Sequence, residues 1–104
     1  MKSIVTDETR YCFFCGNEAS CDHHLIFGTS RRDFSEKYGL KVPICDACHT
    51  RGEYVVCRIH DNPMAEKLSK MLGQALFELE MVSKGMTKDE ARQKTIKEAG
   101  QSWL

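Results

Sequence analysis

All six cysteines and all four histidines of this 104-residue chain lie between Cys12 and His60. Four of the cysteines form two Cys-x-x-Cys pairs, Cys12 with Cys15 and Cys45 with Cys48. Each pair can present two thiolates to one metal ion, and two pairs complete the tetrahedral four-cysteine site that is typical of structural zinc. The spacing therefore predicts that these four cysteines bind a structural zinc ion.

Six cysteines in a short chain could instead form three disulfides, but that interpretation requires a secreted protein. The segment from Met1 to Asp7 becomes charged too soon for a secretory signal peptide. No apolar run approaches the roughly 20 residues of a membrane span. We therefore expect a cytoplasmic protein without a membrane partner, whose small core gains stability from bound zinc.

The histidines indicate a second metal centre. Asp22, His23 and His24 are consecutive, His49 directly follows the second cysteine pair, and His60 precedes a long helical pattern. A four-cysteine zinc site needs none of these residues. Their grouping predicts a separate divalent-metal site. For His60 the alternative is that it is an ordinary surface histidine and not a ligand.

This arrangement resembles the HNH, or His-Me finger, endonucleases, in many of which a four-cysteine zinc site clamps a ββα-metal module. The family pattern runs Cys-x-x-Cys, His-His-Ile and then Leu-Cys-x-x-Cys-His. This chain reads Cys12-x-x-Cys15, His23-His24-Leu25-Ile26 and Ile44-Cys45-x-x-Cys48-His49. The resemblance covers roughly half of the chain and is greatest to small phage-borne nucleases. One departure is that residues 38–44 contain no Asn, whereas the family usually has one just before the second cysteine pair.

The resemblance implies a role for each of these side chains. His24 matches the general base, and His23 and His49 match metal ligands, with His60 as a further candidate ligand at the start of a helix. Asp22 would orient a histidine or contact the metal itself. The catalytic ion would be Mg²⁺, Mn²⁺, Ni²⁺ or Zn²⁺, and the substrate would be DNA.

Two cysteines, Cys21 and Cys57, remain outside the zinc set. We interpret them as small buried apolar residues, because four thiolates already satisfy a zinc ion. The alternative is that Cys57 and His60 form a third ligand pair.

The charge of the chain gives only weak support for nucleic-acid binding. Fifteen basic residues balance fifteen acidic ones, whereas DNA-binding proteins usually show a basic excess. Arg31, Arg32 and Lys41 are the candidate phosphate contacts near the histidine pair, because phosphate binding needs charge but no base reading. An ordinary solvated surface is the alternative for these residues.

The surrounding elements indicate an α+β fold. We expect strands at 21–27 and 40–44, on either side of a short helix that Ser30 caps and Gly39 ends. Residues 54–57 are expected to be extended. A long helix begins at Pro63 and ends near Lys84, and a capping box at 87–90 opens a last helix to about residue 99.

The long helix carries apolar residues in steps of three and four, namely Met64, Leu68, Met71, Leu72, Ala75, Leu76, Leu79 and Val82. We interpret this stripe as the face that packs against the core. One domain is therefore predicted over 1–104, with a zinc-stapled ββα-metal module over about 11–83 and a C-terminal helix over about 87–104.

These observations predict a metal-dependent HNH-type DNA endonuclease of phage or prophage origin, which hydrolyses phosphodiester bonds. The first alternative is a non-catalytic zinc finger that binds nucleic acid or protein. The second is a degenerate HNH fold kept as an accessory factor in phage recombination or packaging. The Asp22-His23-His24 run favours the enzyme, because a binding finger has no use for it.

Overall fold

The structure is a computed structural model that describes residues 1–54 and 57–104. Two short strands, β1 (Cys21–His24) and β2 (Lys41–Ile44), pair antiparallel, so that Cys21 lies opposite Ile44 and His24 opposite Lys41. Both strands fall within the predicted ranges, although β1 ends three residues before residue 27. The predicted extended segment at 54–57 includes residues 55 and 56, which lie outside the described residues.

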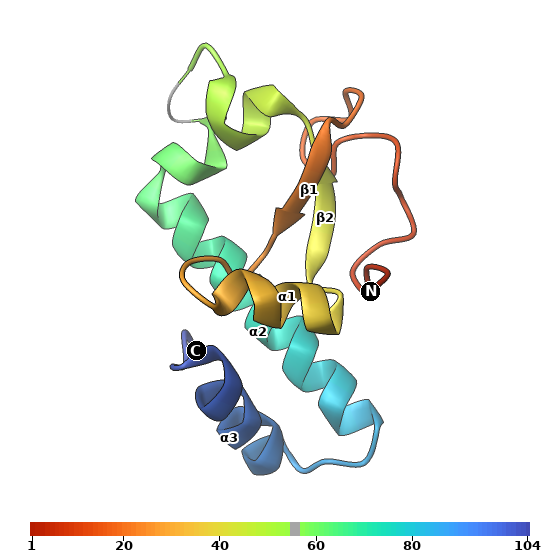
Figure 1. The fold of residues 1–104 in the computed structure, drawn as a ribbon, viewed down its shortest axis with the longest axis vertical. Coiled ribbons are helices and arrows are strands. Elements are labelled where there is room, and N and C mark those ends of the chain that lie inside the picture. Colours follow the sequence, from red (N-terminus) through yellow and green to blue (C-terminus); the bar gives the residue numbers. More distant parts are fainter. Residues whose placement is uncertain (55–56) are drawn as a thin grey trace.

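Helix α1 (Arg31–Tyr38) connects the two strands (Figure 1). Gly39 ends it with φ +70°, as predicted. The prediction that Ser30 caps it was wrong. Ser30 has φ +68° and its side chain makes no capping hydrogen bond, because a capping side chain needs extended backbone at that position.

Helix α2 (Pro63–Ser83) is the longest element and passes behind α1 in Figure 1. Two short helical segments, η1 (Ala47–Arg51) and η3 (Ile59–Asp61), precede it. The sequence offers Asn62 or Asp61 as the cap of this helix, and the side chain of Asn62 takes that position by accepting hydrogen bonds from the N–H groups of Met64 and Ala65.

The prediction that the apolar stripe of α2 faces the core was wrong for most of its residues, and of the stripe Leu76 and Val82 pack against the core while remaining partly exposed. The residues of α2 that are buried are Ser69, Gly73, Gln74, Phe77 and Met81. The leucines at 68, 72 and 79 are exposed, as is Met64. A Cβ on Gly73 would lie 2.9 Å from side-chain atoms of Leu25 and Ile26, so glycine allows the buried face of α2 to approach the segment after β1 closely.

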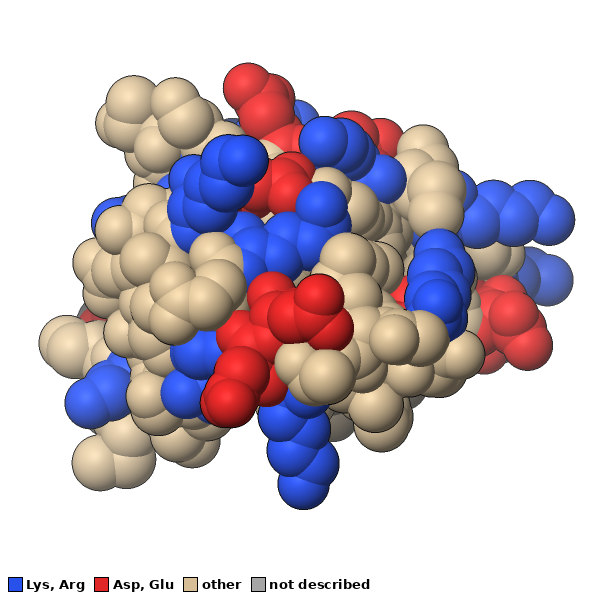
Figure 2. Space-filling view, turned by 90° about the horizontal axis from the view of Figure 1, so that it is seen from below, with Lys and Arg blue, Asp and Glu red and all other residues tan. Residues whose placement is uncertain are grey.

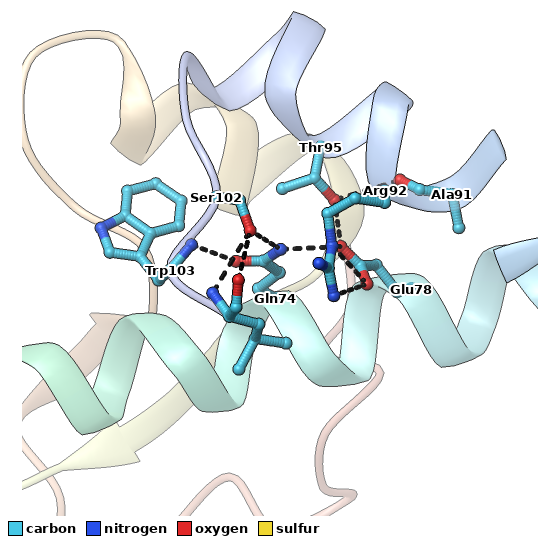
Figure 3. Close-up of polar contacts among 8 residues, drawn as sticks. Gln74, Glu78, Ala91, Arg92, Thr95, Ser102 and Trp103 are labelled. Carbon is cyan, nitrogen blue, oxygen red and sulfur yellow. Dashed lines mark hydrogen bonds and ion pairs between the residues drawn. The ribbon is translucent and has the colours of Figure 1, made fainter. Parts of the chain in front are cut away.

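Helix α3 (Lys88–Ala99) begins with the predicted capping box, in which Thr87 and Glu90 exchange hydrogen bonds. A polar network joins it to α2 (Figure 3). Glu78 of α2 accepts hydrogen bonds from Arg92 and from Thr95. The C-terminal tail joins the same network through Gln74, which accepts a hydrogen bond from the backbone N–H of Trp103.

Buried apolar residues form two clusters. The larger lies between α1, β2, α2 and α3, and comprises Leu25, Ile26, Phe34, Leu40, Val42, Phe77, Met81, Ala91 and Ala99. The smaller surrounds the cysteines and comprises Cys12, Ile44, Cys45 and Ile59. The protein is therefore a small α+β structure with a two-stranded sheet, in which the cysteine cluster lies beside one end of the sheet.

Acidic and basic side chains are interspersed over the end of the molecule drawn in Figure 2, in keeping with the neutral net charge. No helix in the described part of the chain combines the length and the apolar character that a bilayer crossing requires.

Candidate metal centres

The four knuckle cysteines converge as predicted. The Sγ atoms of Cys12, Cys15, Cys45 and Cys48 all lie within 4.8 Å of one another. Zinc–sulfur bonds of about 2.3 Å place tetrahedral thiolates about 3.8 Å apart, and the Sγ atoms of Cys15 and Cys45 are 3.5 Å apart. All six cysteines of the chain are free thiols. The cluster could therefore hold a metal ion such as zinc.

Backbone hydrogen bonds hold the two cysteine pairs in place. The N–H of Gly16 donates to the carbonyl of Cys12, and Gly16 adopts φ +80° in this turn. The N–H of Phe13 donates to the carbonyl of Pro43, which ties the first pair to β2. Cys45 directly follows β2, so the sheet fixes both pairs relative to each other.

The thiols differ in their preference for the ionised form. Burial raises the pKa of Cys12, but the N–H groups of Cys15, Cys45 and Phe14 outweigh it and lower this pKa to about 6. Burial and the neighbouring thiols raise the pKa of Cys48. A bound cation would remove this conflict, because it stabilises all four thiolates together.

Three histidines form a second group. The ring nitrogens of His23, His49 and His60 offer ligand atoms within 4.8 Å of one another. Strand β1 supplies His23, η1 supplies His49, and η3 supplies His60. The ring centroids of His49 and His60 are 4.5 Å apart, and those of His23 and His60 are 5.0 Å apart. The structure thus brings the three predicted ligands together.

The surroundings of His23 determine which of its nitrogens carries the proton. Its Nε2 lies 2.8 Å from the hydroxyl of Ser69, and that hydroxyl donates to the carbonyl of Leu25 over 2.7 Å. Since the hydroxyl proton is used in this way, Ser69 accepts from a protonated Nε2. The Nδ1 atom of His23 is then a bare lone pair, buried and without a hydrogen-bond partner among the described residues. An unpaired buried acceptor of this kind fits a metal ligand.

The other two histidines are held in the same manner. The Nδ1 atom of His60 lies 3.4 Å from a carboxylate oxygen of Glu66. The Nδ1 atom of His49 lies 3.8 Å from the thiol of Cys21. The carboxylate of Glu66 favours the proton on Nδ1 of His60 and leaves its Nε2 as the candidate ligand atom, whereas the thiol of Cys21 can donate to or accept from Nδ1 of His49.

Burial favours the neutral form of His23 and of His49, which is the form that binds metal. Burial, together with His60, His49 and His24, lowers the pKa of His23 from 6.5 to about 3. Burial and then His60 lower the pKa of His49 as well.

His24 follows His23 directly in β1, and because strand side chains alternate between the two faces of a sheet, it lies on the opposite face. Its Nε2 lies 2.8 Å from a carboxylate oxygen of Glu36, a residue of α1. The hydrogen bonds from His24 and then Lys41 lower the pKa of Glu36 to about 2, so this carboxylate is ionised near neutrality. An ionised partner at Nε2 leaves Nδ1 of His24 as the basic nitrogen.

Both faces of β1 border one cleft, with a volume of about 350 Å³. His24 and Arg32 line it together with the three clustered histidines. Asp22 also lines it, but it lies 4.0 Å from Lys41 and is not part of the histidine group.

The other predicted DNA contacts make intramolecular interactions. The guanidinium of Arg31 donates to the carbonyl of Ala99 and to the side chain of Gln101, and lies over the ring of Trp103. The ammonium group of Lys41 lies 3.0 Å from Glu36. Of the three predicted basic residues, Arg32 alone lines the cleft.

The interpretation of Cys21 and Cys57 as buried residues was wrong, since both are exposed. Cys21 borders the histidine cleft, whereas Cys57 belongs to neither group of potential ligands among the described residues. The sequence pattern missed Ser69 and Glu36, which orient His23 and His24.

No protein-family model matches the chain, and neither a curated protein nor a solved structure matches it significantly. Function must therefore be inferred from the residues and geometry of the two centres.

Proposed function

We propose that this chain is a metal-dependent endonuclease of the HNH type, which hydrolyses phosphodiester bonds in DNA. One observation carries the proposal: a cluster of three histidines and a carboxylate-oriented fourth histidine line the same cleft. A general base beside a metal site with open positions is the arrangement that phosphodiester hydrolysis needs.

The chain's own residues have separate tasks in this proposal. His24 takes a proton from the attacking water at Nδ1, while Glu36 holds its Nε2–H and stabilises the imidazolium that results. His23, His49 and His60 hold the divalent ion. When bound, that ion supplies charge stabilisation to the scissile phosphate and the leaving oxygen. Glu36 takes the orienting position for which the family resemblance leads us to expect Asn.

The architecture supports the same family. An antiparallel pair of strands precedes α2, and the histidine ligands come from β1 and from the two short segments before α2. We propose that β1, β2 and α2 form a ββα-metal unit, and that zinc at the four cysteines fixes the segment from Cys45 to His49. Arg32 contacts the DNA backbone at the edge of the cleft.

A plasmid-nicking assay across Mg²⁺, Mn²⁺, Ni²⁺ and Zn²⁺ tests this proposal. His24→Ala should lower the cleavage rate by about a hundred- to ten-thousand-fold, as for loss of a general base. Its circular dichroism spectrum and zinc content should equal those of the wild type. Gln93→Ala, an exposed change on α3, is the control and should cut at the wild-type rate.

Cleavage by His24→Ala at the wild-type rate would remove His24 from the mechanism. DNA binding without cleavage in any metal would instead favour the non-catalytic zinc finger.

A further inference from the structure

The outward face of α2 is apolar along its whole length. At 3.6 residues per turn, seven apolar residues and no polar residue of α2 fall within an arc of about 100°. They are Met64, Leu68, Met71, Leu72, Ala75, Leu79 and Val82. Met71 and Val82 are half-buried, and Val82 also packs against the larger apolar cluster. We call these seven residues the outer stripe. Its large members reach 73% exposure at Met64 and 65% at Leu79.

The inward face of the same helix is the more polar one. Ser69 and Gln74 are buried there, and Gln74 and Glu78 make the network that docks α3 and the C-terminal tail (Figure 3). A surface helix normally turns its apolar stripe toward the core, and a helix that is apolar on its outer face is normally covered. Contiguous exposed apolar surface of this extent marks an interaction site.

The outer stripe is nearly symmetrical about Gly73, the middle residue of α2. Met64 and Val82 are each nine positions from Gly73, and Met71 and Ala75 are each two positions from it. Leu68 and Leu79 are five and six positions away. An antiparallel copy of the helix would therefore set Met64 opposite Val82, Met71 opposite Ala75 and Leu68 close to Leu79, with Leu72 and the small Ala75 near the crossing.

Charge along one flank of the stripe agrees with this arrangement. Lys67 is the one charged residue among the exposed positions of α2. Glu78 lies on the same flank, at nearly the same distance from Gly73, and is already bonded to Arg92. In an antiparallel pair, the same flanks of the two helices lie side by side, so Lys67 of each copy approaches Glu78 of the other.

Each end of the outer stripe continues into a hollow. At the N-terminal end, Leu68 and Leu72 border a hollow of about 280 Å³ beside Phe14. At the C-terminal end, Leu79 and Leu104 border a hollow of about 410 Å³. An antiparallel pairing places the N-terminal hollow of one copy against the C-terminal end of the other.

We propose that two copies of this chain form a two-fold symmetric dimer through the outer stripes of antiparallel α2 helices. The occupant of this face is a second copy because the stripe is complementary to itself in both apolar positions and charge. A closed two-fold interface also leaves no unpaired stripe that would lead to open-ended assembly.

Sedimentation equilibrium at tens of micromolar measures the mass. Wild type should sediment at twice 11.9 kDa, or about 24 kDa. Leu72→Glu should weaken dimerisation at least about a hundredfold, because two carboxylates would be buried at the centre. Ile96→Glu on α3 is the matched control, since Ile96 is 40% exposed and Leu72 is 39% exposed. It should remain a dimer.

Lys67 tests the direction of pairing. Lys67→Glu should raise the dimer dissociation constant by about two- to tenfold, because it faces Glu78 of the other copy. Lys67→Ala should have less effect than Lys67→Glu. In a parallel dimer, by contrast, opposite flanks of the two helices lie side by side, so Lys67 does not face Glu78, and Lys67→Glu would differ little from Lys67→Ala.

Several outcomes would overturn the proposal. These are a wild-type mass of 11.9 kDa at every concentration, a dimer that survives Leu72→Glu, or equal dissociation constants for Lys67→Glu and Lys67→Ala. Circular dichroism checks that each variant folds. Should Leu72→Glu fail to fold, Leu79→Glu at the other end of the stripe carries the same expectation.

Discussion

Ser69→Ala tests the assignment of the histidine cluster as a metal site. The hydroxyl of Ser69 accepts a hydrogen bond from Nε2 of His23 and donates one to the carbonyl of Leu25. Removing the hydroxyl leaves Nε2 of His23 and the carbonyl of Leu25 without this partner. It also removes the interaction that fixes the proton on Nε2. The proton of His23 is then free to occupy Nδ1, where it removes the lone pair that would bind a metal ion.

The expected size of the effect follows from these two bonds. Loss of a partner that orients a metal-bound histidine typically costs about ten- to a hundredfold in metal affinity. Leaving a buried polar group unsatisfied costs about 1–3 kcal/mol of stability, and the better helix propensity of alanine returns a few tenths of a kcal/mol. We expect Ser69→Ala to lose about 2 kcal/mol of unfolding free energy and to bind the second metal ten- to a hundredfold more weakly.

The assay is isothermal titration of Mn²⁺, Co²⁺ or Zn²⁺ into protein whose cysteine cluster is already saturated with zinc, together with urea unfolding. Ser83→Ala is the control, because Ser83 is an exposed serine of the same helix whose hydroxyl donates only to the carbonyl of Glu80. It should bind metal like the wild type. If Ser69→Ala also binds metal with wild-type affinity, the reasoning about the proton on His23 is refuted.

Three further predictions follow from the other contacts. Cys45→Ser should bind no zinc and should be unfolded or aggregated, because metal binding and folding are coupled in such clusters; metal analysis and circular dichroism check this. Between pH 6.5 and about 3 the unfolded chain, but not the folded one, protonates His23, so stability falls as pH falls. With the histidine centre free of metal, this protonation lowers the free energy of unfolding by about 1.4 kcal/mol between pH 7.5 and 5.5. His23→Gln should abolish that loss in urea titrations at both pH values. Glu36→Gln should lower the cleavage rate about tenfold or more without changing DNA affinity in a binding assay.

The elements that could be predicted from the sequence are those with local signals. Asn62 before Pro63, the capping box at 87–90 and Gly39 each fix a helix end through the chemistry of neighbouring residues. The convergence of the four cysteines was predictable because Cys-x-x-Cys spacing carries its own geometry.

The orienting residues could not be predicted, because they come from distant parts of the chain. Ser69 is 46 positions from His23, and Glu36 is 12 positions from His24. A serine within an amphipathic helix and a glutamate in a short helix give no signal of their own. Buried Ser69 becomes informative only when it is known which face of α2 is covered.

The orientation of α2 shows the limit of periodicity. An apolar stripe at helical spacing identifies a face that avoids water, but it does not say whether the same chain or another molecule covers that face. Here Gly73 allows close approach on the polar side, and Gln74 and Glu78 join α3 and the tail through hydrogen bonds. Those interactions hold the inward face in place and leave the apolar stripe outside.

The two candidate metal centres are joined through the backbone. As a result, the histidine centre depends on the cysteine centre more than the cysteine centre depends on the histidines. Cys48 and His49 are consecutive, and the N–H of His49 donates to the carbonyl of Cys45. A metal that fixes the cysteines therefore also fixes the position of His49 in the second centre. His23 and His60, by contrast, are held by contacts with α2 through Ser69 and Glu66, which do not involve the thiols. Loss of metal from the cysteines should thus displace a ligand of the histidine centre, whereas loss of metal from the histidines leaves the cysteine cluster intact. This order suits the endonuclease that we propose, in which a structural ion would stay bound while a catalytic ion exchanges with solvent.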